Sequence, residues 1–187
     1  MSATEIDIPA IHVMLDELKQ RFPESSLNTL IIVSAKNQQL FLIKNNSIVS
    51  SYPISTAKAG LGNLSNSYKT PLGLHKIDSK IGDGAELGAI FKARLNTKRI
   101  AKILKSPEKR SESDTITTRI LWLTGMEYGI NLGGDVDSHS RYIYIHGTNE
   151  EGHLGTPVSH GCIRMGNLDI INLFDQVDVG TLVNITR

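Results

Sequence analysis

Two short stretches of the sequence contain the residue types that an acyl-transfer reaction needs. The only cysteine, Cys162, lies in "SHGCIRM" at 159–165, and His146 ends the run "YIYIH" at 142–146. A cysteine is activated when a base within hydrogen-bond reach takes its proton and a third group holds that base in place. The competing interpretation is a small buried thiol, because a free cysteine often packs as an apolar residue. The glycines and histidines beside both stretches favour Cys162 as a thiolate nucleophile and His146 as its base.

The backbone around these two residues is expected to complete the chemistry. No acidic residue occurs in "YIYIHGT", so a backbone carbonyl near Gly147 is the expected group that orients His146. Gly161 permits a sharp turn and a close approach of the substrate. The N–H groups of Gly161 and Cys162 are therefore expected to form an oxyanion hole.

Strand alternation predicts which side chains face the site. In "RYIYIHG", Tyr142, Tyr144 and His146 fall on one face, and two isoleucines that suit the core fall on the other. We expect Tyr144 to line the cleft, although an aromatic residue on a strand commonly serves packing.

Three residues next to Cys162 are expected to support it. Ser159 is expected to act by hydrogen bonding, and His160 by orienting the loop or by adding positive potential. Arg164 is expected to contact a substrate carboxylate or to shape the site, because its guanidinium is a fixed cation with a bidentate fork. A salt bridge that braces the loop is the alternative role for Arg164.

A metal site is the other chemistry that the histidines raise. Four of them are spaced seven residues apart: His139, His146, His153 and His160. Strong zinc motifs pair their ligands at short spacings, and neither H-E-x-x-H nor C-x-x-C occurs in the sequence. We therefore expect no metal and no organic cofactor. His139 and His153 are interpreted as loop residues, and His12 and His75 as surface or partly buried residues.

Length and composition are those of one ordinary folded domain. The chain has 187 residues, of which 40% are hydrophobic and 21% are charged. The formal net charge of +1 gives no electrostatic reason to expect nucleic-acid binding. A single cysteine excludes an intramolecular disulfide, which suits a reducing cytoplasm.

The same sequence gives an expectation about location. No run of about 18 apolar residues occurs, so no membrane span is expected. Acidic residues interrupt the first 22 residues, which argues against a signal peptide. We expect a cytoplasmic protein, or a periplasmic or cell-envelope protein if an export signal has been removed.

Periodicity predicts the elements that position these residues. The helical spacing of Ile11, Leu15, Leu18 and Phe22 predicts an amphipathic helix within an N-terminal extension, 1–27. Strands are predicted at 29–34, 39–44, 47–55, 70–77, 118–125, 141–147 and 181–186. Many short strands predict a mainly β domain over 28–187, sandwich- or barrel-like, with short helices and a long inserted loop.

Two further segments are less regular. A second short helix is predicted between Gly166 and Val179, with Asn167 as its N-cap. Residues 78–118 keep no period for long, and a basic helix at 91–105 is expected within them. We interpret 78–118 as a lid or a partly ordered insertion and its cations as a solvated face. Trp122, the only tryptophan, is assigned to the core.

At "IHGT…SHGCIRM" the sequence resembles the L,D-transpeptidase catalytic domain family (YkuD-type), whose signature is a histidine, a spacer and [S/T]-H-G-C. The resemblance extends over roughly 28–186 and includes "KTPLGLHKI" and "GTLVNIT". It implies that the substrate is a peptidoglycan stem peptide, cut after a diamino acid at position three through a thioester on Cys162. It also implies sensitivity to carbapenem-type β-lactams.

The sequence departs from this family in two places. The spacer between His146 and Ser159 has twelve residues and is shorter than the form often written for the family, which suggests a trimmed loop over the cleft. Arg164 stands where many members carry asparagine, so it brings a fixed positive charge close to the acyl-donor contacts.

The expected location decides which reaction we predict. A cytoplasmic member of this family would meet soluble muropeptides and abundant water. We therefore predict an L,D-carboxypeptidase that removes the terminal D-alanine of tetrapeptides in murein recycling. The alternatives are an exported L,D-transpeptidase that forms cross-links and a non-catalytic muropeptide-binding module. A papain-like hydrolase is disfavoured, because there the cysteine precedes the histidine.

Overall fold

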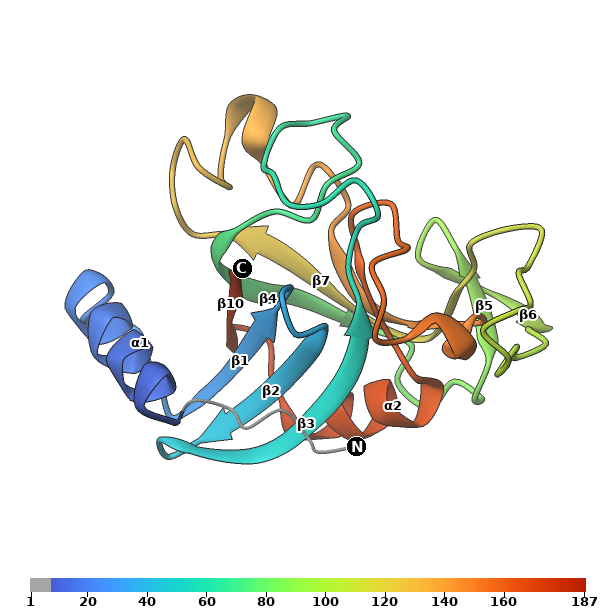
Figure 1. Cartoon of the computed structure of the whole chain (residues 1–187), viewed down its shortest axis with the longest axis horizontal. Helices are drawn as coiled ribbons and strands as arrows, with labels where there is room; N and C mark the ends of the chain where they lie inside the picture. The colour runs from blue at the N-terminus through green and yellow to red at the C-terminus, as the bar shows by residue number, and fades with distance from the viewer. Residues whose placement is uncertain (1–7) are drawn as a thin grey trace.

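The computed structural model describes residues 8–187, so the part of the predicted N-terminal extension before Ile8 lies outside the described residues. The helices are α1 (Ile8–Arg21), η1 (Gly134–Val136), η2 (Glu151–His153) and α2 (Asn167–Gln176). The strands are β1 (Thr29–Ser34), β2 (Gln39–Lys44), β3 (Ser47–Ser55), β4 (Gly73–Ile81), β5 (Ala89–Lys92), β6 (Leu95–Ile100), β7 (Ile116–Gly125), β8 (Tyr144–Thr148), β9 (Ile163–Met165) and β10 (Leu182–Thr186). The predicted mainly β fold is confirmed (Figure 1).

The strands form one sheet that closes on itself. Its order is β4-β10-β1-β2-β3-β9-β8-β7-β5-β6, and β4 also pairs with β7. Closure of β7 onto β4 gives the barrel-like form of the prediction and leaves no free edge around the ring. The β5–β6 hairpin continues from the first residues of β7 and lies outside the ring (Figure 1).

The inside of the barrel is an apolar cluster to which nearly every strand contributes. On β1, Ile31 and Val33 point into it, as strand alternation requires. Ile145 of β8 and Ile163 of β9 belong to the same cluster and are 0% exposed. Each such side chain contributes about 2 kcal/mol through burial. The core therefore fixes β8 and β9 from one side, and their other side is free to carry chemistry.

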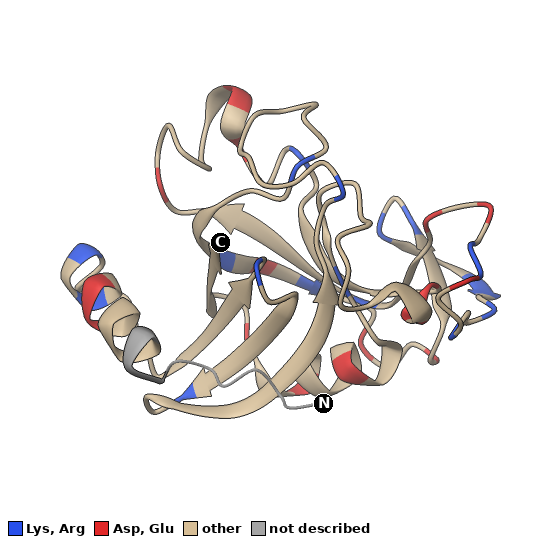
Figure 2. Cartoon of the chain, in the orientation of Figure 1, with Lys and Arg blue, Asp and Glu red and all other residues tan. Residues whose placement is uncertain are grey.

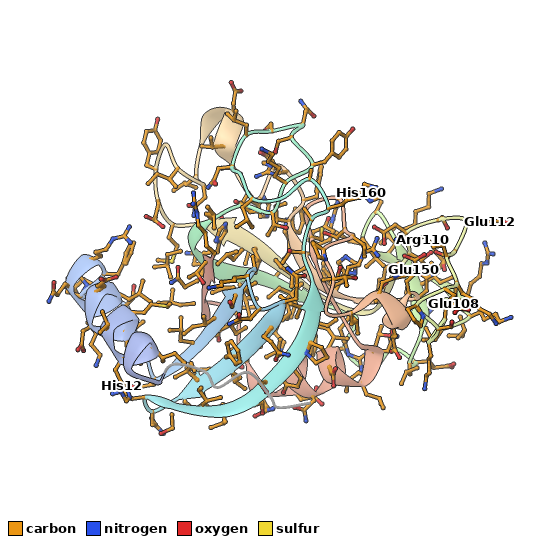
Figure 3. The ribbon with its side chains drawn as sticks, viewed as in Figure 1. His12, Glu108, Arg110, Glu112, Glu150 and His160 are labelled. Carbon is orange, nitrogen blue, oxygen red and sulfur yellow. The ribbon has the colours of Figure 1, made fainter. Side chains whose placement is uncertain are left out.

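Helix α1 covers part of the outside of the barrel. Its apolar stripe of Ile11, Leu15 and Leu18 packs on Leu30 and Phe41, which point outward from β1 and β2. The predicted N-terminal helix is confirmed and ends at Arg21, shortly before Pro23. His12 lies on the exposed side of this helix (Figure 3).

The basic helix expected at 91–105 is wrong. The segment instead begins with the β5–β6 hairpin, which turns at Ala93 and Arg94 with φ of 47° and 67°. These values match a two-residue turn of type I′, which suits the twist of the flanking strands. Pairing of β5 with β7 supplies backbone partners that an isolated helix would lack. Lys and Arg gather at this end of the molecule and are largely exposed, as expected of a solvated face (Figure 2).

Residues 101–115, here called the anchored segment, are irregular but are tied to the chain that follows β8. The Leu104 N–H donates to the Asn149 carbonyl at 2.8 Å, and the Gly152 N–H donates to the Leu104 carbonyl at 3.0 Å. The Ser111 N–H donates to Glu150 Oε1 at 2.7 Å. Figure 3 shows Glu150 pointing toward this segment. The predicted long loop is therefore a hairpin followed by a docked segment.

Two predictions of burial made from the sequence are wrong. His75, expected at the surface or partly buried, is 0% exposed, and its ring nitrogens lie 2.9 Å from the Gly73 carbonyl and 2.8 Å from Ser138 Oγ. Burial lowers the pKa of His75 to about 4, so its ring is neutral at neutral pH. Trp122 is only partly buried and stacks on His139, with ring centroids 4.0 Å apart.

The predicted second helix is confirmed as α2, with a different start. Its N-cap is Gly166, and Asn167 is the first helical residue. The Asn167 side chain is needed elsewhere: it accepts hydrogen bonds from Thr117 and Thr118 and donates one to the Thr148 carbonyl. Among the helices of residues 8–187, none is long and apolar enough to cross a membrane.

Candidate active site

The parallel pairing of β8 and β9 places the predicted base and nucleophile on one face of the sheet. His146 is the Cα partner of Arg164 in this ladder. Cys162 directly precedes β9 and lies two positions before Arg164, which places it on the same side as Tyr144 and His146. His146 and Cys162, which belong to different strand segments of the sequence, thus lie on the same face of the barrel wall.

The thiol of Cys162 contacts the backbone at the start of β8. Its Sγ accepts from the Tyr144 N–H at 3.4 Å and donates to the Tyr142 carbonyl at 3.3 Å. Tyr142 has φ of 57° and precedes the strand, which begins at Tyr144 and not at residue 141 as predicted. Burial raises the pKa of the Cys162 thiol to about 11.

The imidazole of His146 is held in one tautomer. Its Nδ1 lies 2.7 Å from the Gly147 carbonyl, which can only accept, so Nδ1 carries the proton and Nε2 does not. The prediction that a backbone carbonyl orients His146 is confirmed. Gly147 must be glycine for a separate reason: a Cβ there would lie 2.6 Å from the Thr117 carbonyl of β7.

The resting charges differ from those expected. His146 is 2% exposed, and burial lowers its pKa. With the pKa of Cys162 raised, both groups are neutral at pH 7, and the thiolate expected from neighbouring cations is not the resting state. This pair can act by general-base catalysis, in which His146 takes the thiol proton as the carbonyl is attacked.

The turn before Cys162 is built by Ser159. Its hydroxyl accepts from the Gly161 N–H at 3.2 Å and donates to the Cys162 carbonyl at 2.6 Å. Gly161 has φ of 133°, a conformation that favours glycine. Its N–H is therefore already paired, which corrects the expected two-donor oxyanion hole. The Cys162 N–H has no hydrogen-bond partner within the described residues, so it can donate to an oxyanion.

Arg164 is buried beneath the site. Its Nη2 lies 2.5 Å from Asp114 Oδ2 and its Nη1 lies 3.1 Å from Glu150 Oε2, and only 3% of its side chain is exposed. Each terminal nitrogen of Arg164 is paired with a protein carboxylate, which contradicts the substrate-contact half of the expected substrate-contact or site-shaping role. The bracing salt bridge, which was the alternative, is what the structure shows.

Replacing Arg164 with alanine is expected to lower the free energy of unfolding by about 3 kcal/mol. Two carboxylates would lose their cation, although Ser111 still satisfies Glu150 and Asp114 remains partly exposed. Urea unfolding at pH 7 measures the change, with the exposed Arg99→Ala as the matched control. An unchanged midpoint combined with weaker substrate binding would return Arg164 to the substrate-contact role.

Asp114 links the buried part of the site to its surface. Its Oδ2 lies 3.2 Å from Nδ1 of His160, whose side chain is 71% exposed. Burial alone would raise the pKa of Asp114, but Arg164 and His146 nearby lower it. Asp114 is thus an anion beside the candidate base. On the outer side, His160, Tyr68 and Tyr142 line a cavity of about 290 Å³.

Tyr144 serves packing more than it lines a cleft. It is 5% exposed and packs in one cluster with Phe91 and Ile120, on which Cys162 also packs. Its hydroxyl accepts from Arg94 Nη1 at 3.1 Å. The backbone of Tyr144, not its ring, contacts the thiol.

A sequence comparison places this site in a known family. The description "L,D-transpeptidase catalytic domain", YkuD, matches residues 28–185, which include both Cys162 and His146. The chain belongs to the YkuD family. The sequence resemblance to the L,D-transpeptidase catalytic domain is therefore confirmed.

Curated relatives of this YkuD chain match it over short stretches. "Probable L,D-transpeptidase YbiS" of Escherichia coli (strain K12) is 54% identical over 43 residues, which are 23% of this chain and 14% of that protein. "Probable L,D-transpeptidase ErfK/SrfK" of Salmonella typhimurium is 56% identical over 45 residues, 24% of this chain and 15% of that protein. The matched stretches are thus a small part of these relatives' own length.

Solved structures share the fold. L,D-transpeptidase 3 from Mycobacterium tuberculosis, in complex with a faropenem-derived adduct, has a TM-score of 0.52 at 18% identity, covering 86% of this chain and 60% of that one. LdtMt1 in complex with imipenem has a TM-score of 0.51 at 17% identity, covering 85% and 59%. At these identities the likeness concerns the fold alone.

Residues of this YkuD domain that the sequence analysis missed come from distant segments. Asp114 lies in the anchored segment, and nothing in "SESDTITT" marks it. Arg141 donates to the carbonyls of Asn63 and Lys69, at 2.9 and 2.6 Å, and its charge near Cys162 partly offsets the rise in the thiol pKa. Neither contact has a local sequence signal, because both join segments that lie far apart in the sequence.

The histidines do not assemble into a metal site. Within residues 8–187, no group of three or more His, Cys, Asp or Glu side chains is arranged to hold a metal ion. His153 is buried, and its Nε2 lies 3.0 Å from the Lys109 carbonyl. The His139 ring stacks on the Trp122 ring.

Proposed function

We propose that this YkuD domain transfers the acyl group of a peptidoglycan stem peptide through a thioester on Cys162. The observation that carries the proposal is the ladder of β8 and β9, which puts an oriented imidazole and the only thiol on one face. General-base activation of a cysteine requires this combination: a base, a nucleophile, and a group that holds the base.

The residues take the following roles in the proposal. His146 Nε2 accepts the thiol proton while Sγ bonds to the scissile carbonyl carbon, and the Cys162 N–H stabilises the oxyanion. The carbon–nitrogen bond then breaks, His146 returns the proton to the leaving amine, and D-alanine departs. Water attacks the thioester, His146 accepts its proton, and the sulfur leaves as the thiol.

We propose hydrolysis as the main outcome, which makes the protein an L,D-carboxypeptidase. Hydrolysis requires no binding site for a second peptide, whereas cross-linking requires an acceptor strand to be held next to the thioester. We further propose a cytoplasmic role in murein recycling, where the substrates are soluble muropeptides.

β-Lactams of the carbapenem type are proposed as inhibitors. The proposal draws on two structures of the same fold, one in complex with imipenem and one with a faropenem-derived adduct. When a β-lactam acylates Cys162, its ring opens and the amine stays attached to the acyl group. Cys162 is then blocked for as long as the thioester lasts.

Incubation of the pure protein with a disaccharide tetrapeptide tests the proposed function. Mass spectrometry should show loss of one D-alanine and accumulation of the tripeptide. A second reaction with excess tetrapeptide acceptor measures cross-linking under the same conditions. Dimers that outweigh tripeptide would replace the carboxypeptidase by a transpeptidase, and no turnover of either kind would leave a muropeptide-binding module.

A further inference from the structure

Arg94 is held at the tip of the β5–β6 hairpin in an unusual setting. It is the second residue of the turn, with φ of 67°, and pairing of β5 with β7 fixes where the turn lies. Its Cζ lies 4.6 Å from the ring centroid of Trp122 and 5.2 Å from that of Tyr142. Stacking of this kind holds a guanidinium in place while leaving its edge free for hydrogen bonds.

The edge of this guanidinium is largely unused. Arg94 donates one hydrogen bond, to the Tyr144 hydroxyl. Across residues 8–187, no carboxylate lies within ion-pair distance of Arg94. Arg164 differs, because two carboxylates neutralise it. Arg94 is therefore a preorganised cation with free donors for a carboxylate, which a guanidinium binds in bidentate fashion.

The side chains that hold Arg94 belong to residues whose backbones touch the thiol. Tyr142 accepts from Cys162 Sγ through its carbonyl, and Tyr144 donates to Sγ through its N–H. Arg94 also lines a cavity of about 590 Å³ together with Phe91, which packs in the same cluster as Cys162. Tyr142 and Tyr144 thus contact the guanidinium through their side chains and the thiol through their backbones, which connects Arg94 to the proposed point of attack through one layer of residues.

We propose that Arg94 binds a free carboxylate of the stem peptide beside the scissile bond and so selects the substrate. This inference rests on the proposed function and specifies its substrate. Two carboxylates meet the description: that of the terminal D-residue, which is the leaving group, and that on the side chain of the third stem residue where this residue is a diamino dicarboxylic acid. Both give the same recognition chemistry, and the substrates of the test separate them.

The test compares Arg94→Gln and Arg94→Lys with the wild type and with Arg99→Gln. Arg99 is an exposed cation on β6, the strand that follows the turn, and serves as the matched control. Each protein receives three tetrapeptides: the free acid, one with the terminal D-alanine amidated, and one with the third residue's side-chain carboxylate amidated. Values of KM and kcat are measured separately, and thermal melting checks that the hairpin remains folded.

The expected loss for Arg94→Gln is about 10- to 100-fold in kcat/KM on the free acid, mainly through KM, because one charge-assisted contact is removed. Arg94→Lys should lose less, because it keeps the charge without the fork. When the recognised carboxylate is amidated, wild type and Arg94→Gln should have equal kcat/KM values on that substrate. Whichever amide shows this equality identifies the carboxylate.

Binding measured by calorimetry in a Cys162→Ala background separates failure of this inference from failure of the proposed function. Adding Arg94→Gln should weaken binding of the free acid about 10- to 100-fold and leave binding of one amide unchanged. Equal losses on all three peptides, in binding and in kcat/KM, would overturn the role of Arg94 even if the wild type turns over. Lack of turnover with intact discrimination would instead refute the proposed reaction and keep the carboxylate site.

Discussion

Replacing Cys162 with alanine is expected to lower the rate of D-alanine release by about 10,000-fold or more. The covalent intermediate can form on no other cysteine, because the chain contains only this one. The change removes a half-buried sulfur whose contacts are two long hydrogen bonds to the backbone of β8, so the barrel should persist. Release of D-alanine from a disaccharide tetrapeptide, followed by mass spectrometry, measures the effect.

The control for this experiment measures acylation of Cys162 directly by an inhibitor. Wild-type protein treated with imipenem should gain the mass of the acyl adduct, and Cys162→Ala should not. Unchanged thermal melting of the variant shows that its inactivity is chemical. Residual turnover within about 10-fold of the wild type would mean that the reaction does not pass through a thioester.

Replacing His146 with glutamine is expected to lower kcat/KM by about 100- to 10,000-fold. Glutamine can still donate to the Gly147 carbonyl but has no nitrogen that accepts and releases a proton near neutral pH. Substrate binding should change little, since His146 acts on the thiol and not on the peptide. A selective rise in KM would contradict the base role.

The pH dependence of the wild type follows from the resting charges. Burial lowers the pKa of His146, and the base must be neutral, so activity is present above that lowered pKa and is lost as pH falls through it. The thiol, with its pKa raised to about 11, stays protonated across neutral pH. We expect kcat/KM to be level between about pH 7 and 9 and to fall only at pH values below the ordinary imidazole pKa of about 6.5.

Thiolate absorbance at about 240 nm, measured against pH in the free protein, reports the protonation state of Cys162 without substrate. It should appear only well above neutral pH and should be absent from Cys162→Ala. A thiolate signal already present at pH 7 in the wild type would mean that the two groups rest as an ion pair. In His146→Gln the acid limb of the rate profile should disappear along with most of the rate.

Local pattern sufficed for the first three barrel strands and for the face of β8 on which His146 lies. The strands at β1, β2 and β3 begin and end where alternation and turn residues predict. His146 was placed correctly because the isoleucines beside it have to face the core. These features depend on neighbours within a few positions, which the sequence displays directly.

The misplaced features depend on partners far away in the chain. The turn at Ala93 and Arg94 has neither glycine nor asparagine, so its left-handed residues carry no turn signal, and pairing with β7 overrides the helical tendency. The sequence predicts a substrate-contact or site-shaping role for Arg164 because its partners, Asp114 and Glu150, come from two other segments. Burial of His75 likewise arises only when β4 meets the loop that carries Ser138.

The parallel ladder of β8 and β9 has a consequence for how this protein can change over evolution. Neighbouring parallel strands are joined by a connection that leaves and re-enters the sheet, and the ladder itself sets the separation of imidazole and sulfur. Residues can be gained or lost in that connection while the distance between the two groups stays constant. The twelve-residue spacer can change length only in its exposed part, residues 155–157, because Glu150 earlier in the spacer is buried and pairs with Arg164.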